Sequence, residues 1–172
     1  MNVQRITKIA LFAALLALIS PIAIPTSIVP FTLSSLMIYI LSFSLKPVDA
    51  LISVLVYILL GVIGLPVFSG YQAGLQVLTG PTGGFIIGYI PASFIISLLV
   101  SGKKTVLKYI YSFISGTLII YMFGLLMFSF VMDLNFVNSL FITVIPFLIF
   151  DIVKMTLGII TCIILNKRFT NI

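Results

Sequence analysis

Two ionisable residues stand one helical turn apart inside an apolar run near the end of the chain. Asp151 and Lys154 lie in the segment PFLIFDIVKMTLG, residues 146–158. The i, i+3 spacing places both side chains on one face of a helix. A carboxylate accepts hydrogen bonds and an ammonium donates them. The pair could therefore hold a small polar molecule that carries both donors and acceptors.

The depth of this pair in its apolar run favours a functional role over a role in packing alone. A charge near the centre of a bilayer costs about 2.5–3.5 kcal/mol on insertion scales. Lys154 is roughly 18 Å of helix from the polar residue Asn166 at about 1.5 Å per residue, too far to reach the membrane surface easily. Three interpretations stay open: a ligand site, a proton relay, or a buried ion pair that only fixes packing.

The composition predicts the kind of protein that surrounds this pair. Of the 172 residues, 62% are hydrophobic and only 7% are charged, whereas soluble domains average about 25% charged residues. The apolar runs are continuous and lack the alternation of membrane strands. We therefore expect an all-α integral membrane protein that forms a single domain over residues 1–172.

Apolar runs and their breaks predict a bundle of six transmembrane helices. Pro146 is expected to kink the last of them, and Pro91 the fourth. Gly84 and Gly88 have the G-x-x-x-G spacing that lets a neighbouring helix approach closely. The expected helices span approximately residues 9–24, 31–45, 49–64, 83–100, 106–132 and 140–165.

The distribution of charge predicts the orientation of this bundle in the cell membrane. With six spans, all Lys and Arg residues except Lys154 fall on the side shared by both termini, and the opposite side carries only Asp133. The positive-inside rule then places both termini in the cytoplasm. The basic residues on that side are Arg5, Lys8, Lys46, Lys103, Lys104, Lys108, Lys167 and Arg168.

A Gly/Pro-rich extracellular loop is expected between the third and fourth helices. The stretch Gly64–Gly84, GLPVFSGYQAGLQVLTGPTGG, has six glycines, two prolines and no charge. Gly and Pro prevent a stable spanning helix here. Irregular apolar backbone at membrane depth is tolerated where it lines a cavity, so we expect a capping loop, although an ordinary surface loop is the simpler alternative. The candidate ligand-binding residues in it are Tyr71, Gln72, Gln76, Thr82 and Gly83.

Several functional classes lack the residues they need. The chain has no histidine, which excludes a Ser-His-Asp set. It has no phosphate-loop motif for ATP and no cluster of metal ligands. The basic residues are scattered, which does not suit nucleic acid. We expect no enzyme activity and no cofactor.

Several segments together resemble the BioY family, the biotin-specific S components of energy-coupling-factor (ECF) transporters. They are VPFTL (29–33), GLPVFSG (64–70), GPTGGFIIGY (80–89), and Asp151 with Lys154 after a proline. The resemblance implies a six-helix subunit that captures biotin from outside with high affinity. It also implies that Asp151 and Lys154 bind the polar atoms of biotin.

The same resemblance implies protein partners. A transmembrane T subunit and two ATPase subunits would drive release into the cell. An A-x-x-x-A surface on the first helix would contact the T subunit, with Ala10/Ala14 favoured over Ala13/Ala17. Two other functions stay open: an S component for another small vitamin, and a proton-coupled carrier of small molecules.

Overall fold

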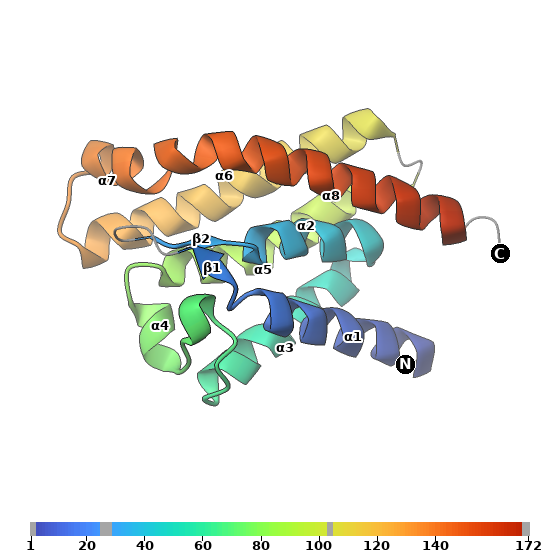
Figure 1. Ribbon diagram of the computed structural model, residues 1–172, viewed down its shortest axis with the longest axis horizontal. Helices are drawn as coiled ribbons and strands as arrows, with labels where there is room; N and C mark the ends of the chain where they lie inside the picture. The colour runs from blue at the N-terminus through green and yellow to red at the C-terminus, as the bar shows by residue number, and fades with distance from the viewer. Residues whose placement is uncertain (1–2, 25–28, 103–104, 170–172) are drawn as a thin grey trace.

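The structure is a computed structural model that describes residues 3–24, 29–102 and 105–169, with side chains as far as residue 161. Long helices dominate it (Figure 1). They are α1 (Val3–Ile19), α2 (Ser34–Ser44), α3 (Pro47–Val62), α5 (Gly83–Val100), α6 (Val106–Val131) and α8 (Leu148–Phe169). Shorter elements connect them: β1 (Ala23–Ile24), β2 (Phe31–Thr32), η1 (Ser69–Tyr71), α4 (Leu75–Thr79), α7 (Phe136–Thr143) and η2 (Ile145–Phe147).

Three stretches of the described residues are long and apolar enough to cross a membrane. They are Gly83–Val100, Val106–Val131 and Phe136–Thr161. Helices α2 and α3 are apolar but shorter, with 11 and 16 residues. The prediction of a helical membrane protein is therefore confirmed.

The first two predicted helices differ from the observed ones at their facing ends. Helix α1 ends at Ile19, and α2 begins at Ser34 instead of Phe31. Strand β1 pairs antiparallel with β2, so Phe31 is extended. The reason is partly local: Ile24 precedes Pro25 in the sequence, and a residue before proline is driven out of helical geometry; Phe31 and Thr32 then pair with this extended segment. The chain thus makes a short hairpin where continued helix was expected.

The two prolines predicted to kink helices behave differently. Pro91 lies inside α5, which continues unbroken from Gly83 to Val100. Pro146 lies in η2, between the end of α7 and the start of α8. The expected single helix over residues 140–165 is therefore divided, because proline cannot complete the hydrogen bonds of a helix interior. This break places Asp151 in the first turn of α8.

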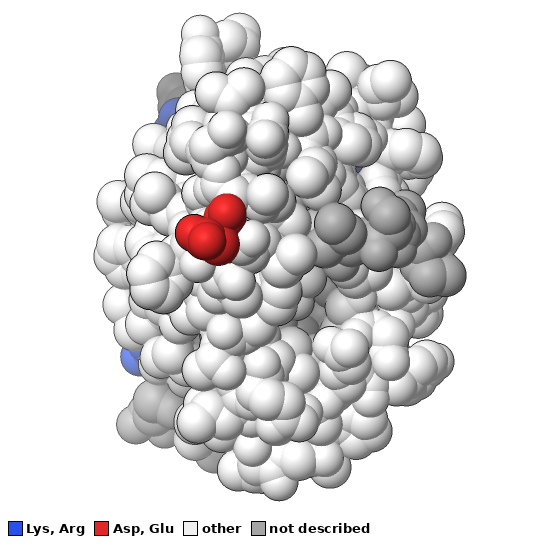
Figure 2. Space-filling view, turned by 90° about the vertical axis from the view of Figure 1, so that its left-hand side faces the viewer, with Lys and Arg blue, Asp and Glu red and all other residues white. Residues whose placement is uncertain are grey.

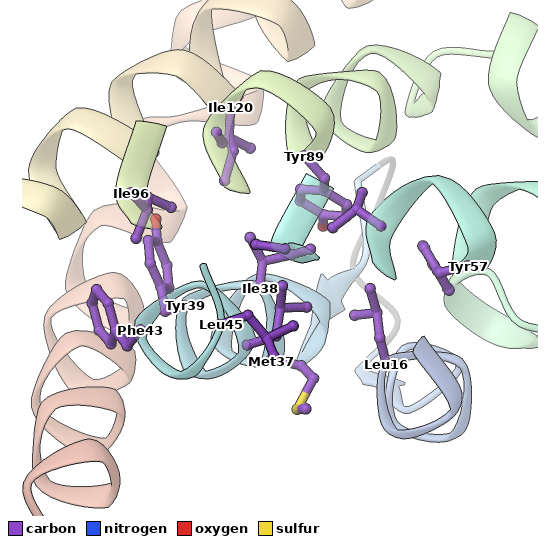
Figure 3. Packing of buried hydrophobic residues seen from close by; sticks show 14 of the residues in the cluster. Leu16, Met37, Ile38, Tyr39, Phe43, Leu45, Tyr57, Tyr89, Ile96 and Ile120 are labelled. Atoms are coloured by element: carbon purple, nitrogen blue, oxygen red, sulfur yellow. The ribbon is translucent and has the colours of Figure 1, made fainter. Parts of the chain in front are cut away.

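The core of the protein is built around α2. Its buried side chains reach α1 on one side and α5 and α6 on the other, and Figure 3 shows Met37, Ile38 and Tyr39 among them. Helix α5 packs most extensively against α6. A Cβ atom added at Gly84 or Gly88 would meet the backbone of α6, so both glycines permit the close approach that their spacing predicted.

The two ends of the bundle differ in charge. Helix α1 begins and α8 ends at one end of the molecule, while α4 and the α6–α7 turn lie at the other (Figure 1). Figure 2 views this second end, where one acidic group lies on the face and basic side chains are visible only at its edge. Near the first end, Arg5 pairs with the buried Asp49 at 2.6 Å and joins α1 to α3.

Candidate ligand-binding site

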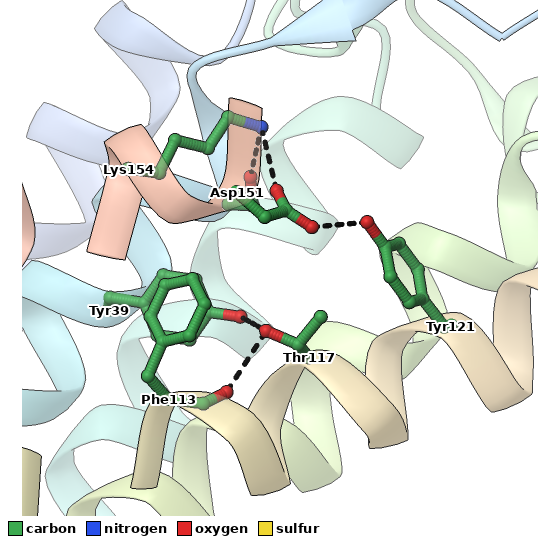
Figure 4. Close-up of polar contacts among 7 residues, drawn as sticks. Tyr39, Phe113, Thr117, Tyr121, Asp151 and Lys154 are labelled. Carbon is green, nitrogen blue, oxygen red and sulfur yellow. Dashed lines mark hydrogen bonds and ion pairs between the residues drawn. The ribbon is translucent and has the colours of Figure 1, made fainter. Parts of the chain in front are cut away.

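The ion pair predicted from the sequence forms at the start of α8. Lys154 Nζ lies 3.5 Å from Asp151 Oδ1 (Figure 4). The Lys154 residue is only 6% exposed, and the Asp151 side chain is 13% exposed. Both groups also line a cavity. Two opposite charges are thus held inside the protein beside an internal space.

Two further side chains complete the coordination of this pair. Tyr121, on α6, donates a hydrogen bond to Asp151 Oδ2. Lys154 donates to Ser35 Oγ, on α2, at 2.9 Å. Asp151 and Lys154 are therefore each bonded to a different neighbouring helix, which is how buried charges are usually retained.

Aromatic rings cover the ammonium group on another side. Lys154 Nζ lies 4.5 Å from the centroid of the Phe31 ring, within the range of a cation–π interaction. Phe31 is itself stacked on Phe147, with centroids 5.4 Å apart, and packs against Phe150 at 4.1 Å. The hairpin strand β2 therefore contributes directly to the environment of the lysine.

A second polar pair lies on the wall of the cavity. Tyr39 and Thr117 are joined through their hydroxyl groups at 2.6 Å. Thr117 donates its proton to the carbonyl oxygen of Phe113 at 3.0 Å, so Tyr39 must be the donor to Thr117 (Figure 4). The Tyr39 oxygen keeps acceptor capacity beside the cavity.

The cavity has a volume of about 1030 Å³, and its polar groups come from most parts of the fold. Asp151 and Lys154 are the charged residues among its described lining. The predicted loop residues Tyr71, Gln72, Gln76 and Thr82 also line it, so the structure brings them around the same space as the ion pair. Their contact with a ligand stays a prediction.

Gly83 differs from the other predicted site residues. It is absent from the described residues that line the cavity. It is the first residue of α5, and a Cβ atom there would overlap the backbone of Leu78 at the end of α4. Its observed role is therefore close packing of α4 against α5.

The Gly/Pro-rich stretch, called the cover below because several of its residues line the cavity, is tied to the bundle at several points. Gly70 N donates to the Pro21 carbonyl at 3.1 Å, and Gly74 N donates to the Gly61 carbonyl at 2.8 Å. Phe68 is fully buried against Tyr57, edge to face. This stretch is less irregular than expected, because it contains the short helix α4.

Tyr71 is an exposed residue of this cover that also lines the cavity. The residue is 69% exposed, and its φ of 61° lies in the left-handed region, which is uncommon outside glycine. The preceding Gly70 has φ 68°, so the chain turns sharply at the edge of the cavity.

The two candidate alanine pairs of α1 point in different directions. Ala10 and Ala14 are exposed, whereas Ala13 is only 1% exposed. Small residues on an outward face leave room for a partner helix, so the contact predicted at Ala10 and Ala14 stays a prediction.

Four polar residues of the cavity near the ion pair were not predicted from the sequence: Ser35, Tyr39, Thr117 and Tyr121. One signal was available for two of them. Thr117 and Tyr121 are four residues apart in an otherwise apolar stretch, and this spacing places them on one helical face. A polar stripe on an apolar helix predicts a face that is turned away from lipid.

Comparison with known proteins gives consistent results over nearly the full chain. A model of the BioY family matches residues 1–171. The biotin transporter BioY of Thermotoga maritima is 34% identical over 165 residues, which cover 95% of this chain and 96% of the relative. The biotin transporter BioY2 of Lactococcus lactis subsp. cremoris is 37% identical over 179 residues, or 99% and 98% of the two chains.

The fold also matches a solved structure. The crystal structure at 2.1 Å of the S-component for biotin from an ECF-type ABC transporter aligns with a TM-score of 0.87 and 25% sequence identity. The alignment covers 96% of this chain and 92% of that one.

Proposed function

Because this chain belongs to the BioY family, we propose that it serves in biotin uptake, as the substrate-binding S component of an ECF-type importer. It is a multi-pass membrane protein. The observation that carries the proposal is the Asp151–Lys154 pair on the wall of a cavity of about 1030 Å³. Cavities that enclose small molecules typically measure about 300–1,000 Å³.

The lining of the cavity suits the chemistry of biotin. Biotin combines a compact ring system that has N–H donors and one carbonyl with an apolar chain that ends in a carboxylate. Asp151 can accept from N–H groups, and Lys154 can donate to a carbonyl or carboxylate. Tyr71, Gln72, Gln76 and Thr82 would meet the ligand from the cover side. Phe85 and Ile86 offer apolar surface to the rest of the molecule.

The proposed topology has six crossings by α1, α2, α3, α5, α6 and the α7–α8 segment, and it places both termini in the cytoplasm. Helices α2 and α3 are short for a bilayer of about 30 Å, but α2 is buried among other helices and does not have to match the lipid alone. The end with little charge, shown in Figure 2, would then face outward, and the cavity would receive its ligand from that side.

The proposed partners are a transmembrane T subunit and two ATPase subunits, which would provide the energy for release. The exposed Ala10 and Ala14 would contact the T subunit, since small side chains let two helices approach closely. This interface is separate from the proposed binding site, because neither alanine lines the cavity. An A10L/A14L variant should therefore bind biotin normally and lose uptake.

Titration calorimetry of the purified full-length chain with biotin tests the proposal. We expect saturable binding without ATP, and a loss of affinity well over tenfold for D151A or K154A, since each variant leaves a buried partner unpaired. Riboflavin and thiamin are the comparison ligands, and tighter binding of either would favour another vitamin. Uptake driven by a pH gradient in vesicles without an ATPase would favour a proton-coupled carrier.

A further inference from the structure

We propose that Tyr121 is a positioning residue for ligand binding, because its hydroxyl group fixes the orientation of the Asp151 carboxylate. The proposal rests on the biotin binding inferred above. The two oxygens of Asp151 have different partners: Oδ1 is paired with Lys154 on the same helix, and Oδ2 accepts from Tyr121 on α6. Figure 4 shows the carboxylate held between them.

The helix that carries Tyr121 is well placed to set this orientation. Helix α6 makes its most extensive contacts with α5, where Gly84 and Gly88 let the two backbones come close. Helix α8 has a largely exposed apolar surface near Asp151, including Ile152 and Val153. The Tyr121 hydrogen bond therefore holds the Asp151 carboxylate, on the more peripheral helix α8, in a fixed position relative to the tightly packed α5–α6 pair.

The chemistry of the hydroxyl group determines what Asp151 can offer. A phenol that donates to Oδ2 requires that oxygen to be an acceptor, and each carboxylate oxygen retains a further lone pair. Because Lys154 and Tyr121 occupy one position on each oxygen, the remaining positions can accept from N–H groups of a molecule in the cavity. Tyr121 thus selects ligands that present hydrogen-bond donors to this corner of the cavity.

The test compares Y121F with Y111F by titration calorimetry of the purified full-length protein with biotin. Tyr111 lies on the same helix and is 61% exposed, which makes it a matched control. We expect Y121F to bind biotin about tenfold more weakly, as for loss of a hydrogen bond to a charged group, and Y111F to bind within about twofold of the parent. Circular dichroism and thermal unfolding establish that both variants are folded.

A double-mutant cycle separates positioning from a general structural role. If Tyr121 acts through Asp151, D151N and D151N/Y121F should bind biotin within about twofold of each other. A tenfold penalty for Y121F that persists in the D151N background would overturn the proposal, as would a Y121F variant that binds like the parent.

Infrared spectroscopy provides a readout that needs no ligand. The chain has only three acidic residues, Asp49, Asp133 and Asp151, so a difference spectrum against D151N identifies the carboxylate stretch of Asp151. We expect this band to shift in Y121F and not in Y111F. An unshifted band would overturn the proposal even if D151N binds too weakly for the cycle. If the parent protein does not bind biotin, the proposed function fails while the band still reports on Tyr121.

Discussion

Ser35 and Lys154 are 119 residues apart in the chain, yet Lys154 Nζ donates to Ser35 Oγ at 2.9 Å. Ser35 lies in the first turn of α2, the helix around which the core is packed. The contact therefore joins the ammonium group of α8 to the centre of the bundle, and it gives the buried lysine a neutral acceptor in addition to Asp151.

Replacing this serine should weaken both the fold and the site. We expect S35A to lower the free energy of unfolding by about 1.5–3 kcal/mol, the range for a hydrogen bond to a charged group. Ser44 is the matched control, because it lies on the same helix and its hydroxyl donates to the carbonyl oxygen of Ile40, one turn earlier, at an exposed position. Thermal unfolding in detergent should show a clear decrease for S35A and almost none for S44A. Equal midpoints for the two variants would mean that the contact does not stabilise the bundle.

The ion pair itself can be separated into a structural and a binding contribution. We expect K154M to destabilise the protein by up to about 3–5 kcal/mol, because it leaves Asp151 buried without its counter-charge. The double variant D151L/K154M should regain most of this stability, since apolar replacement of both partners of a buried pair is often neutral. It should still bind biotin at least tenfold more weakly than the parent in titration calorimetry. A double variant with normal affinity would show that the pair serves packing alone.

The helices of this protein could be predicted from sequence because lipid requires long, continuously apolar runs. The residues 83–100 and 106–131 correspond closely to the predicted fourth and fifth helices. The hairpin of β1 and β2 could not be predicted in this way, because Phe31 and Thr32 are as compatible with an apolar run as with a strand. Hydropathy reports whether a segment is apolar and does not report its backbone geometry.

Only the part of the candidate site that depends on the spacing of residues within one helix could be predicted from the sequence. Asp151 and Lys154 share a helical face, so their pairing follows from an i, i+3 rule. The partners Tyr121 and Ser35 come from other helices, and their approach depends on how α2 and α6 pack around α8. The glycines of the cover indicated a loop near the site, but the short helix α4 within it depends on tertiary contacts.

The close contact of α5 with α6 should be sensitive to a single methyl group. A Cβ atom at Gly84 would overlap the carbonyl of Phe123, so we expect G84A to cost about 1–3 kcal/mol through overpacking. Gly158 is the control, because a Cβ there would lie 3.7 Å from Leu36 and 3.9 Å from Tyr39 in ordinary contact. G158A should leave the unfolding midpoint unchanged or raise it slightly, since alanine favours helix by about 1 kcal/mol over glycine. Comparable losses for the two variants would contradict the close packing at Gly84.

The proposed orientation can be tested with single cysteines in a C162S background, which removes the one native cysteine. Lys46 precedes α3, and Asn138 lies on α7; both residues are exposed. Helix α7 and the junction between α2 and α3 lie toward opposite ends of the molecule (Figure 1). Because the positive-inside rule places the basic end in the cytoplasm, a membrane-impermeant maleimide should label N138C in intact cells and K46C only after permeabilisation. The reverse pattern would place the cavity cover on the cytoplasmic side. Labelling of both variants in intact cells would contradict the odd number of crossings, by α3, α5 and α6, that the proposed topology places between the two positions.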